Sequence, residues 1–481
     1  MTASLAPRNR SNRSWTVAIA SLGVFMTALD TLVVANALPA LRSGLHANLG
    51  DLEWTVNAYN LAFAVALLTG AALGDRFGRK RVYSLGVLAF SIASAMAALS
   101  PTVGVLIAAR GVQGLAAAAV MPATLTLIAE AFPAAKRGAA IGLWGGITGL
   151  AVALGPVVGG AIVGGISWHW IFWLNVPIGL ALLPLCFTRL TESFGPRARL
   201  DIRGLLLAGV GFFGVTWGLV RANSIGCTNG ETIIALLSGV ALVTAFLAWE
   251  RRTTSPMLSP ALFRSRGFRA ANGVSFFMYA ALFGVLFLIM QFLQIALGYS
   301  PLAAGLRTLP WTGAPMLVAP IAGALADRYG GKPFMLAGLA LQAIGLGWIA
   351  AIAKPGMSYT WLGVAFGVAG VGISMCFPTV ASAVVGSVPD SEMGIASGTN
   401  SAVREIGGVF GVAVLATLFA SHGDYTSAQT FIHHFKHAVW LGASFSAIGI
   451  FAAATLPARA RSAVVPADDA IDDSEPELLA S

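Results

Sequence analysis

Two ionisable residues lie deep inside long apolar stretches of this chain, where a charge is costly. Asp30 stands about 22 Å into the first apolar stretch, at 1.5 Å per helical residue. Arg110 lies in the fourth stretch, which runs in the opposite direction, so we expect both residues at a similar depth. A carboxylate whose cationic partner comes and goes can bind and release a proton. The pair therefore predicts either proton transfer or a fixed ion pair that ties two helices together.

A second acid, Glu405, is expected about 16 to 18 Å into the thirteenth apolar stretch, beside Arg404. Adjacent residues of a helix point in different directions, so at most one of the two faces an internal pathway squarely. We predict Glu405 as a further proton-carrying acid. The alternative is a side chain that is partly solvated near the mouth of a vestibule.

The composition identifies the elements that must hold these charges. Of the 481 residues, 57% are hydrophobic and only 10% are charged, and the mean hydropathy is +0.79. A soluble chain could not bury that much apolar surface. A bilayer core of about 30 Å needs about 20 apolar residues per helix. We therefore predict an all-α membrane protein with fourteen transmembrane helices, near residues 15–39, 54–73, 82–99, 103–129, 138–163, 168–188, 203–221, 232–249, 269–296, 302–326, 333–353, 358–386, 393–420 and 436–456.

Two short charged segments repeat one pattern in distant parts of the chain. Residues 70–81 include Gly-Asp-Arg-Phe-Gly-Arg-Lys after the second predicted helix, and residues 323–332 include Ala-Asp-Arg-Tyr-Gly-Gly-Lys after the tenth. The two copies are eight helices apart, which fits a repeat of six helices with two further helices inserted between the halves. We therefore predict a 6+2+6 organisation: a tail at 1–14, a six-helix half at 15–190, two extra helices at 200–250, a second half at 268–456, and a disordered acidic tail at 457–481.

Lys and Arg gather in the polar segments on one side of the predicted helices. Because cationic loops stay in the cytoplasm, both termini are predicted to be cytoplasmic. This asymmetry, together with attraction to anionic lipid, accounts for the net charge of +9, so no nucleic-acid partner is expected.

Other residue patterns predict no cofactor and no metal. The three cysteines form no disulfide framework, and the pair His433 and His437 fits a solvated interfacial segment better than a metal site. No Gly-x-x-x-x-Gly-Lys-Ser/Thr phosphate loop is present, so nucleotide is not expected to drive the protein. The first apolar stretch is long enough to span the bilayer and is expected to be an anchor and not a cleaved signal.

Several segments resemble one known family. They are the repeated charged loops, the Leu-Asp-Thr-Leu segment at 29–39, the Arg-Gly-Val-Gln-Gly segment at 110–114, the Gly-Pro segment of the fifth helix, the aromatic run at 167–177 and the segment 400–411. Each is similar to a motif of the major facilitator superfamily. The fourteen helices and the fifth-helix motif resemble its fourteen-helix drug/proton antiporters in particular.

The resemblance, together with the positions of the charged residues, gives expected roles to named residues. Proton coupling is expected from Asp30, Arg110 and Glu405. The antiporter motif is expected on the fifth helix, at Gly142, Gly155, Pro156 and Gly159. Gating is expected from the charged loops and one neighbouring acid, namely Asp75, Arg76, Gly78, Arg79, Asp327, Arg328, Gly330 and Glu130.

It also implies a function. We expect a proton-coupled exporter of drugs, antibiotics or other small lipophilic compounds, working by alternating access as a monomer in a bacterial cytoplasmic membrane, and not an enzyme. An uptake or metabolite carrier of the same fold is the alternative, and a membrane sensor or enzyme is an alternative of a different class. Asp30 favours cationic substrates, but Arg110 and Arg404 leave anions open.

Overall fold

The computed structural model describes residues 10–132, 134–195, 201–226, 228–253, 256, 258, 260–389, 392–420 and 427–457. Within these ranges the regular structure is helical, and fourteen helices are long and apolar enough to cross a membrane. This confirms the predicted all-α fold with fourteen spans. Residues 1–9 and 458–481, which make up most of the two predicted tails, lie outside the described residues.

The first six spans form one half of the molecule. They comprise α1 (Arg10–Leu45), α2 (Leu49–Phe77), α3 (Arg79–Ala98), α4 (Val103–Ala131), α5 (Ala134–Gly165), and the pair α6 (His169–Trp173) and α7 (Asn175–Arg189), which share the sixth span.

The last six spans form the second half. A short 3-10 helix, η1 (Leu262–Arg264), leads into α10 (Arg266–Gln291), which continues as the π-helix η2 (Phe292–Ala296). The tenth span, Leu309–Ala326, comprises α12 (Leu309–Thr312) and most of α13 (Ala314–Tyr329), and the short α11 (Pro301–Arg307) precedes it. The remaining spans are α14 (Gly331–Ile352), α15 (Tyr359–Val385), α16 (Met393–Ala420) and α17 (Ala428–Ala454). The prediction treated the tenth span as one helix. It is interrupted because Pro310 and Pro315 lack the N–H that a continuous helix would use.

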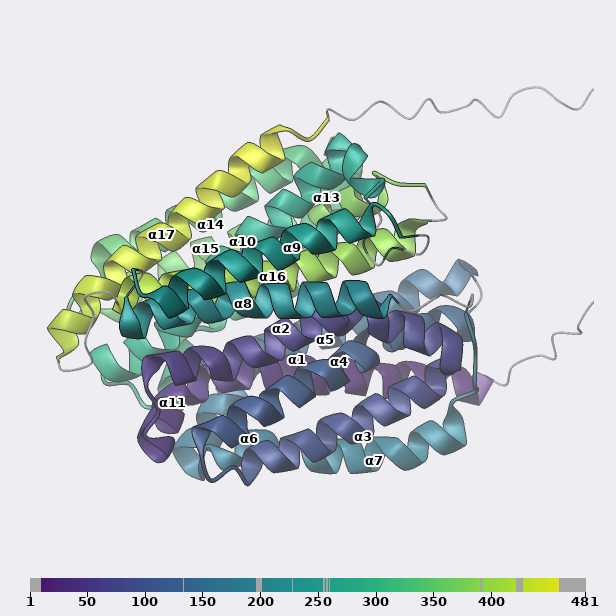
Figure 1. Cartoon of the computed structure of the whole chain (residues 1–481), viewed down its shortest axis with the longest axis horizontal. Helices are drawn as coiled ribbons and strands as arrows, with labels where there is room; N and C mark the ends of the chain where they lie inside the picture. Colours follow the sequence, from purple (N-terminus) through teal and green to yellow (C-terminus); the bar gives the residue numbers. More distant parts are fainter. Residues whose placement is uncertain are drawn as a thin grey trace, which may run out of the picture.

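Two extra helices, α8 (Ile202–Ile225) and α9 (Gly230–Glu250), lie along the boundary between the halves (Figure 1). The α8 helix packs on α9, on α2 of the first half and on α16 of the second. On one side the Trp54 ring of α2 packs at a tilt against Phe213 and Trp217, at centroid distances of 5.2 and 5.8 Å. On the other, the Thr417 hydroxyl of α16 donates to the Leu219 carbonyl at 3.1 Å. The extra helices therefore bridge the two halves.

The start of α1 and the end of α17 lie at the same end of the bundle, as an even number of spans requires; in Figure 1 the start of α1 is on the right and the end of α17 is at the top. We call this the proximal end and the opposite one, which holds α6 and α11, the distal end.

The two copies of the charged loop share one backbone feature. Gly78 and Gly330 end their helices at φ values of +107° and +87°, and each N–H donates to the carbonyl four residues earlier. Glycine adopts positive φ without a steric penalty, which explains why the same residue recurs in both copies.

Candidate functional site

The carboxylate of Asp30 lies at the centre of a buried polar network between the helices of the first half. Asp30 on α1 and Arg110 on α4 are 2% and 1% exposed, and the guanidinium donates to the carboxylate through Nη1. Gln113 and Asn175 also donate to Asp30 Oδ1, at 3.3 and 2.7 Å. The structure thus brings together the two charges that were predicted at one depth, and their part in proton coupling stays a prediction.

Arg110 is held by more than its acidic partner. Its Nε donates to the Thr55 carbonyl of α2 at 3.1 Å, and Nη1 also reaches Gln113 Oε1 at 3.0 Å. The guanidinium lies 4.3 Å from the ring centroid of Tyr59, a cation–π geometry. These contacts would keep the Arg110 guanidinium hydrogen-bonded if the carboxylate were neutralised.

Glu405 is half-buried on α16 and does not join this network. Among the described residues it makes no hydrogen bond and no ion pair with Asp30 or Arg110. It lies within electrostatic reach of Tyr59 on α2 and of Tyr279 on α10, so it faces the region between the halves. Its neighbour Arg404 lies 5.1 Å from the Tyr279 ring centroid and donates to Ser401 at 3.4 Å.

The antiporter-motif segment of α5 packs directly on α1. A Cβ at Gly155 would come 2.6 Å from Leu32, and one at Gly159 would come 2.9 Å from the Val33 carbonyl, so only glycine permits this approach. Gly142 lies in α5, but its surroundings fall outside the part of the chain that the structure describes.

Pro156 connects this motif to the second half through Asn36, at the distal end. The buried Asn36 amide of α1 donates to the carbonyls of Pro156 and Pro301, at 2.6 and 3.1 Å. Gln294 of η2 donates to Asn36 Oδ1 at 2.6 Å and to its carbonyl at 2.9 Å. Asn36 therefore joins the two halves at the distal end. We call this contact of α1 and α5 with η2 and α11 the distal seam.

The first charged loop forms a cluster of ion pairs at the proximal end, made by Asp75, Arg79 and Glu130, which we call the clasp. Arg79 donates to Asp75 at 2.7 and 2.9 Å and pairs with Glu130 of α4. The segment after α7 covers this clasp, because Gly195 N donates to the Asp75 carbonyl at 3.1 Å. Arg76 points outward and lies over the Phe77 ring at 5.4 Å.

The second copy of the loop lies at the end of α13. Arg328 is exposed, with its guanidinium 5.3 Å from the Tyr329 ring centroid. The side chain of Asp327 lies outside the described residues. Lys332 donates to the carbonyls of Ala454 and Leu456, each at 2.7 Å, and so fixes α14 to the end of α17.

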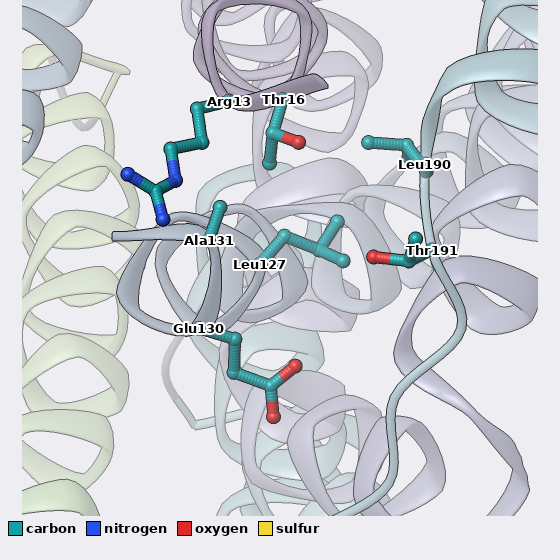
Figure 2. Close-up of a pocket in the computed structure, with 7 residues that line it drawn as sticks. All are labelled: Arg13, Thr16, Leu127, Glu130, Ala131, Leu190 and Thr191. Atoms are coloured by element: carbon teal, nitrogen blue, oxygen red, sulfur yellow. The ribbon is translucent and has the colours of Figure 1, made fainter. Parts of the chain in front are cut away.

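A small pocket lies beside Glu130, where α1, α4 and the segment after α7 meet (Figure 2). The Glu130 carboxylate points away from the Arg13 guanidinium, in keeping with its pairing to Arg79. The pocket volume of about 20 Å³ admits about one water, whereas drug-sized ligands need at least about 300 Å³. It is therefore not a substrate site.

The family model described as Major Facilitator Superfamily matches residues 20–299 and 273–473, which together cover most of the chain. The chain belongs to the major facilitator superfamily. It is a membrane transporter and not an enzyme, and transporters of this superfamily generally need no cofactor.

Bacterial members of the superfamily are similar to this chain over most of its length. The tetracenomycin C resistance and export protein of Streptomyces glaucescens is 35% identical over 86% of this chain and 77% of its own. The multidrug resistance protein Stp of Mycobacterium tuberculosis is 36% identical over 84% of this chain and 76% of its own. The methylenomycin A resistance protein of Bacillus subtilis is 32% identical over 83% of this chain and 86% of its own.

Solved structures of the superfamily share the fold at low identity. A POT family transporter aligns with a TM-score of 0.69 at 14% identity, over 90% of this chain and 94% of its own. The nucleoside transporter NupG aligns with a TM-score of 0.65 at 14% identity, over 92% of this chain and 99% of its own.

Within this member of the superfamily, two residues of the Asp30 network were not among the predicted site residues. Gln113 is the glutamine of the Arg-Gly-Val-Gln-Gly segment, and Asn175 is the asparagine of the aromatic run at 167–177. Both were visible within motifs, but neither motif indicates that its amide points to the same carboxylate.

Proposed function

We propose that this transporter exports small antibiotic or drug-like compounds in exchange for protons, by alternating access. The observation that carries the proposal is the buried carboxylate of Asp30, which one guanidinium and two amides hold at bilayer depth. An ionisable group in a membrane interior is costly and is typical of proton and substrate pathways. Relatives named for resistance to tetracenomycin C and methylenomycin A support export as the direction.

The network suggests how a proton would be coupled to a conformational change. A proton on Asp30 would remove the charge that holds Arg110, while Thr55 and Gln113 would keep the guanidinium hydrogen-bonded. Each proton that crosses the membrane releases about 2.3 kcal/mol per 100 mV, which is enough to concentrate a neutral substrate more than tenfold.

The two ends of the bundle would open in alternation. In this conformation Asn36 and Gln294 hold the distal seam. We place the proximal end, with its Arg- and Lys-rich loops, in the cytoplasm of a bacterial cell, and we assign transport to the monomer. Glu405 is proposed as a second proton-carrying acid, and Asp327 and Arg328 as parts of a second proximal clasp.

Proton release from inverted vesicles tests the proposal. A panel of lipophilic drugs is added to vesicles that contain the wild-type protein, Asp30→Asn, or the control Asp51→Asn, in which an acid at the distal start of α2 is altered. We expect a substrate to collapse the pH gradient with the wild type and the control but not with Asp30→Asn. Unchanged proton movement in Asp30→Asn would contradict coupling through Asp30, and substrate flow in the opposite direction would indicate an uptake carrier.

A further inference from the structure

Two amide side chains on α2 are buried and have no hydrogen-bond partner in the described part of the chain. Asn57 is 0% exposed and Asn60 is 1% exposed, and in both residues neither the amide nitrogen nor the amide oxygen has a partner among the described residues. Buried polar groups in native proteins are nearly always paired, and lipid offers no substitute for water. These two amides therefore indicate a partner that is absent from the protein chain itself.

The helical positions of the two amides direct them toward the region between the halves. Residues three apart share one face of a helix. The other faces of α2 have neighbours: Trp54 lies against α8, Tyr59 against the Arg110 side of α4, and Leu68 against α16. At 3.6 residues per turn, the face with Asn57 and Asn60 lies between the α16 face and the α4 face. It is buried and does not face lipid.

The facing helix carries polar atoms in the same condition. On α16, which packs on α2, Arg404 Nε is buried without a partner among the described residues. Glu405, the next residue of the same helix, makes no hydrogen bond or ion pair in that part of the chain. Polar side chains with unused hydrogen-bonding capacity therefore lie on α16 as well as on α2.

Aromatic rings lie beside α16, on the side where the Arg404 guanidinium contacts the Tyr279 ring. Tyr279 of α10 lies 5.5 Å from Phe283 and 5.9 Å from Phe377, between ring centroids. Glu405 is within electrostatic reach of both Tyr279 and Tyr59, which belong to opposite halves. A compound held here would meet flat aromatic surfaces together with hydrogen-bonding amides.

We propose that Asn57 and Asn60 hydrogen-bond the transported compound, and that this compound is a planar aromatic ring system that carries hydroxyl or carbonyl groups. The inference rests on the proposed transport function and specifies its substrate class. A carboxamide supplies both a donor and an acceptor, which match hydroxyl and carbonyl groups. A lipophilic cation without such groups would leave both amides unpaired, and a site of this kind rejects ligands that cannot form its hydrogen bonds.

Ligand-induced thermal stabilisation of the purified full chain in detergent tests this inference without depending on transport. The probes are a dihydroxyanthraquinone, unsubstituted anthraquinone and tetraphenylphosphonium. We expect the wild type to bind the hydroxylated ring at least about tenfold more tightly than the other two probes, because hydrogen bonds account for the difference. Asn57→Leu and Asn60→Leu should each reduce that preference by about three- to tenfold.

The unliganded proteins separate a ligand contact from a structural role. Leucine removes an unpartnered polar group, so the midpoint of thermal unfolding of each variant should equal or exceed that of the wild type. The matched control is Asn272→Leu, since Asn272 of α10 donates to the Phe268 carbonyl at 2.9 Å and accepts from Asn400 at 3.1 Å. The control should unfold at a lower temperature and keep the preference of the wild type for the hydroxylated ring.

Three results would overturn the inference: an unchanged preference in both leucine variants, a lower unfolding temperature of those variants without ligand, or no binding of either ring by the wild type. If neither ring binds but vesicles still exchange protons for tetraphenylphosphonium, the substrate class is wrong and the proposed export stands. If the expected preference is found and the same compound is not transported, the binding site stands and the proposed export fails.

Discussion

Asp30 persists as a buried carboxylate because three side chains from two other helices donate to it. Arg110 and Gln113 come from α4 and Asn175 from α7, so the carboxylate fixes the relative positions of α1, α4 and α7. Hydrogen bonds to a charged acceptor are the strongest in a protein, and a buried charge that loses partners is destabilising. The protonation state of one residue therefore affects the packing of three helices.

Replacing Asn175 by leucine should destabilise the protein and impair transport. The substitution removes the 2.7 Å donor to Asp30 and leaves the carboxylate with fewer partners. We expect a loss of about 1–3 kcal/mol in the free energy of unfolding, measured by denaturation in detergent. In the background of Asp30→Asn, where the charge is absent, the same substitution should cost less. An equal cost in both backgrounds would show that Asn175 does not act through Asp30.

At this scale the sequence predicted which charges meet but not the amides that complete their environment. Asp30 and Arg110 were predictable because a charge stands out in an apolar helix and its depth follows from the residue count. Asn175 was not, because α6 and α7 break at Leu174 and the direction of the side chain depends on that break. Glu130 was named as a possible partner of the charged loop, and the structure pairs it with Arg79.

Among the helices, α5 holds the distal end together through residues without bulky side chains. A Cβ on Gly160 would collide with the Pro301 carbonyl of α11, and one on Gly305 would collide with the Pro156 carbonyl of α5. The two backbones are therefore in direct contact across the seam between the halves. Small residues allow this approach, and the carbonyls at the contact also accept hydrogen bonds from Asn36.

Gly160→Ala should therefore favour conformations in which the distal seam is open. Overpacking costs about 1–3 kcal/mol, so we expect a cysteine introduced at the buried Ala304 to react about tenfold faster with a membrane-impermeant thiol reagent. Gly165→Ala is the matched control, since among the described residues no atom beyond its own helical turn lies within 4 Å of its added Cβ. Equal labelling rates in the two variants would argue against a closed contact at Gly160.

The sequence predicted the number and order of these helices but not their interruptions. Hydropathy over about 20 residues is a strong signal, and the fourteen spans followed from it. Proline gave no reliable guide to breaks, because Pro122, Pro156 and Pro378 lie inside continuous helices while Pro310 and Pro315 lie at the broken tenth span. Neighbouring helices decide which prolines interrupt a membrane helix.

In the whole molecule, α8 and α9 connect the two halves. The α8 helix contacts α2 through Trp54 and α16 through the hydroxyl of Thr417, so it is attached on both sides of the seam. The repeat of the charged loops predicted two extra helices between the halves. Their position was not predictable, because helices that face lipid on most sides carry little sequence information about their neighbours.

Trp54→Ala should loosen the extra helices from the first half. The substitution removes ring contacts with Phe213 and Trp217, and we expect a loss of about 1–3 kcal/mol in the free energy of unfolding, measured in detergent. Trp361→Ala is the control, because Trp361 is 61% exposed and, within the described part of the chain, has one ring contact, with Trp348. A control that loses as much stability as Trp54→Ala would show that Trp54 has no special part in holding α8.

A helix attached to both sides of a seam limits how far that seam can separate. Because α8 contacts both α2 and α16, it restrains the separation of these two helices while either end of the bundle opens. At another contact between the halves, α5 packs directly on α11, α12 and α13. Alternate opening of the two ends would therefore change the packing of α5 against these three segments more than the packing of α2 against α16.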